Sequence, residues 1–200
     1  MKVIIRSALF FVVFAVLCGV IYPLITTAFG MVAFPFQASG SMLQKDGKTV
    51  GSALIGQSFT DDRYFQGRVS AVGYNTYPAD ENITLDEAKS GSDNLAPSNP
   101  KLKERIQKDL EAFLKANPTV KKDQIPASLF FQSFSGLDPD ITIDAAKIQV
   151  PRIAKAAGID ESKLNAIINT TKTSKFLGIF GDETVNVLKM NIKINDLISK

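Results

Sequence analysis

The stretch Ala8–Ile25, ALFFVVFAVLCGVIYPLI, decides how the chain is organised. It carries no charge, and as a helix it spans ~27 Å at ~1.5 Å per residue, close to the thickness of the hydrocarbon core of a bilayer. No charged residue occurs between Arg6 and Lys45. The sequence therefore predicts a single membrane-spanning anchor helix within residues 1–36.

A cleaved signal peptide is the alternative interpretation of this stretch. Lys2 and Arg6 form a short basic start, and Thr26-Thr27-Ala28 offers small residues at which cleavage would be tolerated. Signal cores, however, usually contain only ~7 to 15 apolar residues. The longer run favours an uncleaved anchor, in which Pro23 would kink the helix or mark its outer end.

The charges that flank the anchor predict its orientation. Lys2, Arg6 and the terminal amine lie on the N-terminal side, whereas the first charges beyond the anchor are at positions 45 to 48. The positive-inside rule then places the N-terminus in the cytoplasm. We expect a single-pass protein of the cell membrane, with a linker over 37–51 and an extracytoplasmic soluble domain over 52–200.

Composition sets limits on this domain. A chain of 200 residues with 45% hydrophobic content has room for one span and one ordinary domain. The formal net charge is only +3, and no stripe of basic residues is present. The sequence therefore predicts no nucleic-acid partner.

Helical periodicity and capping residues predict about three helices in the soluble domain. Asn99 before Pro100 is a helix start, and Asn117-Pro118 ends that helix. A second helical pattern begins near Ile141 and is kinked or broken by Pro151. A third begins at Asp160, whose side chain can cap it.

Strands and loops are predicted around these helices. The segment 52–59 has apolar residues between glycines and predicts a short strand, and the polar segment 60–97 predicts loops. At the end of the chain, apolar residues alternate with other residues, which favours a strand or strand pair. They are Val185, Val187, Met190, Ile192 and Ile194. The expected fold class is α+β, or α/β, with a small sheet.

The residue types available for chemistry are few. Histidine is absent, which removes the usual general base near pH 7 and the commonest metal ligand, and Cys18 is the single cysteine. The segment Asp46–Thr49 ends like a phosphate-binding loop, but Met42 stands where that motif needs its first glycine. We predict no catalytic residues, no metal site and no self-sufficient enzyme.

Several segments, read in order, resemble the KdpC family of potassium-transporting ATPase subunits. They are GSALIGQSF at 51–59, YFQGRVSA at 64–71, SGSDNLAPSNP at 90–100, SGLDPDI at 135–141, QVPRIA at 149–154 and VNVL at 185–188. The segments follow one N-terminal span and extend over nearly the whole chain.

The resemblance implies an accessory, non-catalytic subunit of the high-affinity, ATP-driven potassium uptake complex. Its partners would be a channel-like potassium-binding subunit, a P-type ATPase subunit, a small membrane peptide and the lipid bilayer. The family is described as a catalytic chaperone that raises the ATP affinity of the ATPase subunit. ATP would then be the one ligand, and the resemblance suggests Gln149 as its contact.

The nucleotide contact conflicts with the topology predicted from the flanking charges, because an extracytoplasmic domain would not meet cytoplasmic ATP. We give the topology more weight than a direct nucleotide contact at Gln149. The residues expected at the partner interface are Arg68, Asn94, Asn99 and Asp138, all within the resembling segments. The alternative function is a membrane-anchored extracytoplasmic binding module unrelated to potassium transport.

Overall fold

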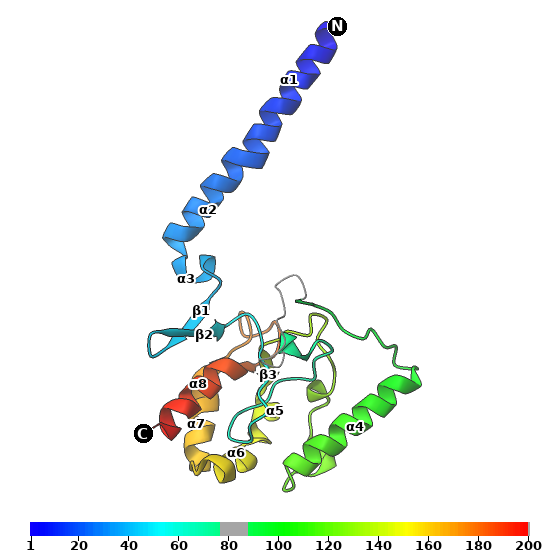
Figure 1. Ribbon diagram of the computed structural model, residues 1–200, viewed down its shortest axis with the longest axis vertical. Coiled ribbons are helices and arrows are strands. Elements are labelled where there is room, and N and C mark those ends of the chain that lie inside the picture. The colour runs from blue at the N-terminus through cyan, green and yellow to red at the C-terminus, as the bar shows by residue number, and fades with distance from the viewer. Residues whose placement is uncertain (77–87, 200) are drawn as a thin grey trace. The chain divides into compact units, whose positions relative to one another are not determined.

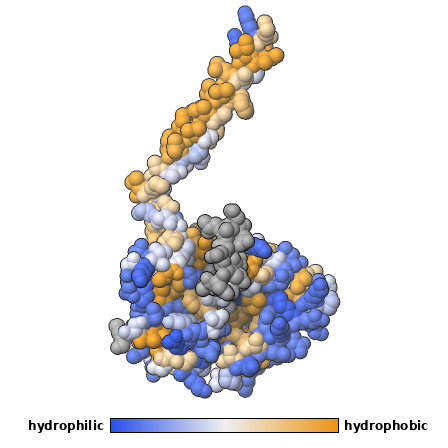
Figure 2. Space-filling model, in the orientation of Figure 1, coloured by the Kyte–Doolittle hydropathy of each residue, from blue (hydrophilic) through white to orange (hydrophobic). Residues whose placement is uncertain are grey.

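One long apolar helix opens the chain. The computed structural model describes residues 1–76 and 88–199 and divides into two units, Met1–Ser52 and Ala53–Lys200 (Figure 1). The helix runs over Lys2–Ala33 with a mean hydropathy of 2.7, and none of its most apolar stretch is buried. Figure 2 shows apolar residues along its length. By length and composition, this helix can cross a membrane.

The helix contains a π turn ahead of its proline. It consists of α1 (Lys2–Val16), a π-helical segment η1 (Leu17–Ile21) and α2 (Tyr22–Ala33). Because Pro23 has no amide hydrogen, the regular pattern of hydrogen bonds cannot continue through it. The Tyr22 N–H instead donates to the carbonyl of Leu17, five residues back. Pro23 thus coincides with a local widening of the helix rather than its end.

The segment predicted as a linker contains regular structure. A short helix, α3 (Pro35–Ala38), precedes an antiparallel hairpin of β1 (Met42–Lys45) and β2 (Lys48–Ser52). Asp46 and Gly47 form its turn with φ of 50° and 74°, as a type I′ turn requires. The strand predicted over 52–59 is wrong, since only Ser52 belongs to a strand.

A small antiparallel sheet lies within the second unit. Its order is β3 (Asp140–Thr142), β5 (Thr184–Asn186), β4 (Lys172–Thr173), so the last strand in sequence is central. The helices of this unit are α4 (Pro100–Ala116), α5 (Ile143–Lys147), α6 (Val150–Ala157), α7 (Glu161–Thr171) and α8 (Val187–Ile198). The short 3-10 helices are η2 (Gly73–Asn75), η4 (Lys122–Gln124) and η5 (Ala127–Leu129).

The core gathers where α7 packs against α6 and α8 (Figure 1). Its largest fully buried apolar side chains come from these helices, from β5 and from one loop residue: Phe65, Ile153, Leu164, Ile168, Val185, Met190 and Ile194. The α+β class with one candidate membrane helix is therefore confirmed.

Local signals placed both ends of α4 and the start of α7 correctly. Asn99 caps α4 by accepting from the Lys101 N–H at 3.0 Å, and α4 ends at Ala116 as predicted. Asp160 caps α7 by accepting from the Ser162 N–H at 2.7 Å. The pattern that began near Ile141 is divided between a strand and the two helices α5 and α6, and Pro151 lies in the first turn of α6.

The strand or strand pair predicted from Val185 onward is confirmed only at Val185, which lies in β5, and is wrong from Val187 on. Only Thr184–Asn186 is extended, and α8 follows directly. Val187, Met190 and Ile194 are buried at helical spacing, so the alternation of Met190, Ile192 and Ile194 was misleading. Asn186 ends the strand because its side chain caps the helix, accepting from the Lys189 N–H at 3.0 Å.

Asn186 connects three parts of the second unit. Its amide Nδ2 donates to the Ala53 carbonyl at 2.9 Å and to the Asp140 carboxylate at 3.1 Å. Burial raises the pKa of Asp140, and the hydrogen bond from Asn186 opposes that rise. The side chain thus joins the start of the unit, the sheet and α8 through one buried amide.

We expect Asn186→Ala to destabilise the second unit by about 2 kcal/mol, since it removes a helix cap and leaves two partly buried acceptors without this donor. The measurement is the melting temperature of the full chain in detergent, which should fall by roughly 5 °C. Asn169→Ala, at an exposed position of α7, is the control and should leave it unchanged. Equal melting temperatures for both variants would contradict this role.

Candidate functional site

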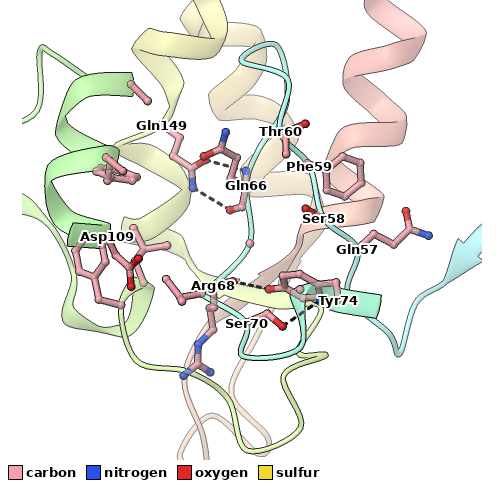
Figure 3. Close-up of a pocket in the computed structure, with 18 of the residues that line it drawn as sticks. Gln57, Ser58, Phe59, Thr60, Gln66, Arg68, Ser70, Tyr74, Asp109 and Gln149 are labelled. Atoms are coloured by element: carbon pink, nitrogen blue, oxygen red, sulfur yellow. Dashed lines mark hydrogen bonds between the residues drawn. The ribbon is translucent and has the colours of Figure 1, made fainter. Parts of the chain in front are cut away.

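A groove of about 550 Å³ lies between the loop that follows Ala53 and helix α4 (Figure 3). The loop side of the groove comes from residues 57–74, and the opposite side from Asp109, Ala112, Phe113 and Ala116. Gln149 also lines the groove, and its side chain is fully buried. The loop over 57–74, called here the groove loop, therefore determines the shape of the site.

Gln149 pairs with the backbone of the groove loop. Its Oε1 accepts from the Gln66 N–H at 2.9 Å, and its Nε2 donates to the Gln66 carbonyl at 3.1 Å (Figure 3). Nε2 also donates to the Ala145 carbonyl at 3.0 Å, and Oε1 accepts from Arg152 at 2.9 Å. All four hydrogen-bonding positions of the amide are filled by the protein.

A second buried amide holds the preceding residue from the other side. Asn191 on α8 accepts from the Phe65 N–H at 2.8 Å and donates to the Phe65 carbonyl at 2.9 Å. The Phe65 side chain is completely buried in the core. Gln149 and Asn191 thus satisfy two successive residues of the groove loop, as neighbouring strands would do in a sheet.

Arg152 completes this network from α6. Its guanidinium donates to the carbonyls of Asp62 at 2.6 Å and Tyr64 at 3.1 Å, and to the side-chain oxygen of Asn117 at 3.0 Å. Burial lowers the pKa of Arg152, and the carboxylates of Asp62 and Asp61 oppose that fall. The Asp62 carboxylate is 3.6 Å away and largely exposed, so neutral oxygens supply most of the contacts of this cation.

Arg68 and Asp138, two of the predicted interface residues, form an ion pair. Arg68 Nη1 lies 2.7 Å from Asp138 Oδ2, and both side chains are about a quarter exposed at 24% and 29%. Arg68 also donates to the Phe131 carbonyl, from Nη2 at 2.9 Å and from Nε at 3.2 Å. This cation fastens the groove loop to the segment 131–138.

Tyr74 closes the groove loop upon itself. Its hydroxyl donates to the Arg68 carbonyl at 2.7 Å, and burial raises the pKa of Tyr74 to about 12. Its ring packs so closely against Gly56 that an added Cβ there would lie 2.5 Å from the ring. At Gly67 an added Cβ would lie 2.7 Å from the hydroxyl. These two glycines are therefore required by the tyrosine, rather than by a ligand.

The other two predicted interface residues lie apart from this ion pair. Asn94 is exposed, with φ of 50°, beside a hollow of about 240 Å³ that Phe131 and Phe134 also line. Asn99 is the cap of α4, and its side-chain oxygen is used there. The structure thus brings Arg68 and Asp138 together and does not join Asn99 to them.

Among the residues that the structure describes, no three His, Cys, Asp or Glu side chains lie close enough to hold a metal ion. Sequence reasoning missed Arg152, Asn117, Asn191 and Tyr74, although the first lies in a segment quoted for the resemblance. The spacing of Arg152, Asn117 and Asn191 carried no signal, because their partners lie far away in the sequence.

Comparison with known proteins gives a consistent result. The family model described as "KdpC: K+-transporting ATPase, c chain" matches residues 4–196. The chain is 47% identical to the potassium-transporting ATPase KdpC subunit of Clostridioides difficile, over 99% of each chain. It is 48% identical to the same subunit of Clostridium kluyveri, over 91% of this chain and 88% of that one.

A third relative, the KdpC subunit of Caldanaerobacter subterraneus, is 45% identical over 98% of this chain and 95% of its own. Matches of this length include both the apolar helix and the groove loop with its supporting amides. The chain belongs to the KdpC family.

Proposed function

We propose that this chain is a non-catalytic accessory subunit of a potassium-transporting ATPase. The observation that carries the proposal is the match over nearly full length to proteins named as that subunit. A single helix fit to cross a membrane supports it. The partners would be the channel-like potassium-binding subunit, the P-type ATPase subunit and the small membrane peptide.

In this proposal the chain assembles through two contacts. The apolar helix Lys2–Ala33, which has no buried residue of its own, joins the other subunits in the bilayer. The soluble unit, outside the cytoplasm, contacts them through the rim of the groove loop at Arg68 and Asp138. These side chains are fixed internally and still partly exposed, so a partner would meet them in a defined position.

The effect on ATP affinity described for the family would then be indirect. One observation supports this reading, since the amide of Gln149 has no hydrogen-bonding position left. The proposed topology agrees with it, because an extracytoplasmic domain would not meet cytoplasmic ATP. A subunit that holds the complex in its assembled form can raise the ATP affinity of its partner by stabilising the binding-competent state.

The topology can be tested with single cysteines. In a Cys18→Ser background, Lys2→Cys lies ahead of the apolar helix and Lys103→Cys lies on the exposed side of α4. In intact cells, a maleimide that cannot cross membranes should label position 103 and not position 2. Permeabilised cells, in which both should react, are the control. Labelling of position 2 alone would show that the chain has the opposite orientation, with its N-terminus outside the cytoplasm.

Arg68→Ala should weaken assembly about tenfold, because it releases the groove loop from Asp138 and Phe131 and removes a charge from the proposed interface. The measurement is the amount of ATPase subunits recovered with the tagged chain, together with potassium uptake at micromolar potassium. Arg63→Ala is the matched control, since Arg63 makes an exposed ion pair with Asp61 at 2.6 Å. Equal recovery with both variants would refute the role of Arg68.

Gln149→Met should lower the yield and melting temperature of the chain, because it removes four buried hydrogen bonds at nearly constant volume. In complexes that still assemble, we expect the KM for ATP to stay within about twofold of the wild type. Gln107→Met, on the exposed side of α4, is the control. A rise of about tenfold in that KM would instead support a nucleotide contact at Gln149.

A further inference from the structure

The second unit exposes four large apolar side chains on one tight turn between β4 and β5. The side chains are 71% exposed at Phe176, 75% at Leu177, 75% at Ile179 and 62% at Phe180. We call residues 176–180 the apolar turn. Single exposed apolar residues are ordinary on protein surfaces, but a contiguous group indicates an interaction site.

Hydrogen bonds fix the apolar turn in this exposed form. The N–H of Phe176 donates to the carbonyl of Phe180 at 2.9 Å, and the N–H of Phe180 donates back at 3.0 Å. Within the turn, the Gly178 N–H donates to the Lys175 carbonyl at 3.0 Å. The turn also continues into β4 and β5, and β5 carries the fully buried Val185. The exposure is therefore a property of an ordered structure.

Leucine is unfavourable at position 177 unless its side chain contacts another molecule. Its φ is 53°, in the left-handed region where Gly and Asn are preferred and leucine is uncommon. The residue thus combines backbone strain with an apolar side chain that is three-quarters exposed. Neither feature stabilises the isolated chain, and strain that gives no local benefit is typical of functional positions.

Charges of both signs surround the base of the apolar turn. Lys172 pairs with Glu183 at 2.6 Å, and Lys175 and Asp182 flank the turn in sequence. An apolar centre with a mixed polar rim is the usual anatomy of a protein interface. A loop that enters an anionic lipid surface is instead favoured by basic residues alone, and the two carboxylates oppose that use.

The small size of the apolar turn also limits its occupant. Stable interfaces bury about 800 Å² on each partner, and four side chains supply only part of that area. A second, free copy of the chain would therefore bind weakly through this turn. A neighbour already held by the same membrane assembly needs less area, because tethering makes the contact effectively intramolecular.

We propose that the apolar turn inserts into an apolar pocket on a neighbouring membrane subunit of the same transport complex. This inference rests on the proposed function, and it adds a specific docking element to it. Leu177 and Ile179 at the tip make the apolar contact, and the charged residues at the base contact the rim of that pocket.

Leu177→Asn tests the inference without endangering the fold. Asparagine suits the left-handed backbone, so the melting temperature of the full chain should stay unchanged or rise. Recovery of the other ATPase subunits with the tagged chain should fall about tenfold, since an apolar contact is lost. Leu54→Asn, at another exposed apolar position, is the matched control and should leave recovery unchanged. Wild-type recovery with Leu177→Asn would overturn the inference.

A photo-cross-linking amino acid at position 179 identifies the occupant in the assembled complex. We expect a cross-link to another ATPase subunit, and none from the same probe at the exposed position 103. Cross-linking only to lipid, or to a second copy of the chain, would overturn the inference while leaving the proposed function intact. If the wild-type chain recovers no ATPase subunit, the proposed function itself fails.

Discussion

The second unit depends on hydrogen bonds to the backbone N–H and C=O groups of Phe65 and Gln66 inside the core. In the part of the chain that the structure describes, no strand lies beside these residues, and an unpaired buried N–H or C=O costs about 1–3 kcal/mol. Gln149 and Asn191 solve this problem, each presenting one amide donor and one acceptor to a residue of the loop. With these contacts, Phe65 can fill the core while its neighbours form the side of a groove.

The conformation of the rest of the groove loop follows from the fixed positions of Phe65 and Gln66. Once Phe65 and Gln66 are fixed, Arg68 lies within reach of Asp138, and Tyr74 can fold back onto the Arg68 carbonyl. The close packing of the Tyr74 ring then restricts positions 56 and 67 to glycine. A segment with almost no helix or strand is thus as well determined as the regular elements around it.

The parts of the fold that sequence could predict were those governed by neighbouring residues. Asn99 and Asp160 cap helices two residues away, so both helix starts were found. By contrast, Asn186 serves as a strand residue and a helix cap at once, and its other contacts reach Ala53 and Asp140. No local pattern contains that information, and the alternation that follows it suggested strands where α8 lies.

The contacts of the candidate site could not be predicted for the same reason, because they join residues far apart in the sequence. Arg68 and Asp138 could be named separately from the resemblance, but their pairing joins positions 70 residues apart. The bond between Phe65 and Asn191 spans 126 residues. The hairpin β1–β2 was missed for a different reason. Its turn, Asp46-Gly47, is a local signal, but the polar composition of the surrounding segment led to its prediction as a linker.

Many polar side chains of this fold form hydrogen bonds within the chain, whereas several large apolar side chains remain exposed to solvent. Gln149, Arg152 and Asn99 direct their polar atoms inward or along the backbone, where each bond stabilises the chain itself. Large apolar side chains remain exposed on the first helix and on the apolar turn, and also at Leu54, Ile55, Phe131 and Phe134. Because burying apolar surface away from water is favourable, these exposed apolar side chains would gain free energy from contact with a neighbour.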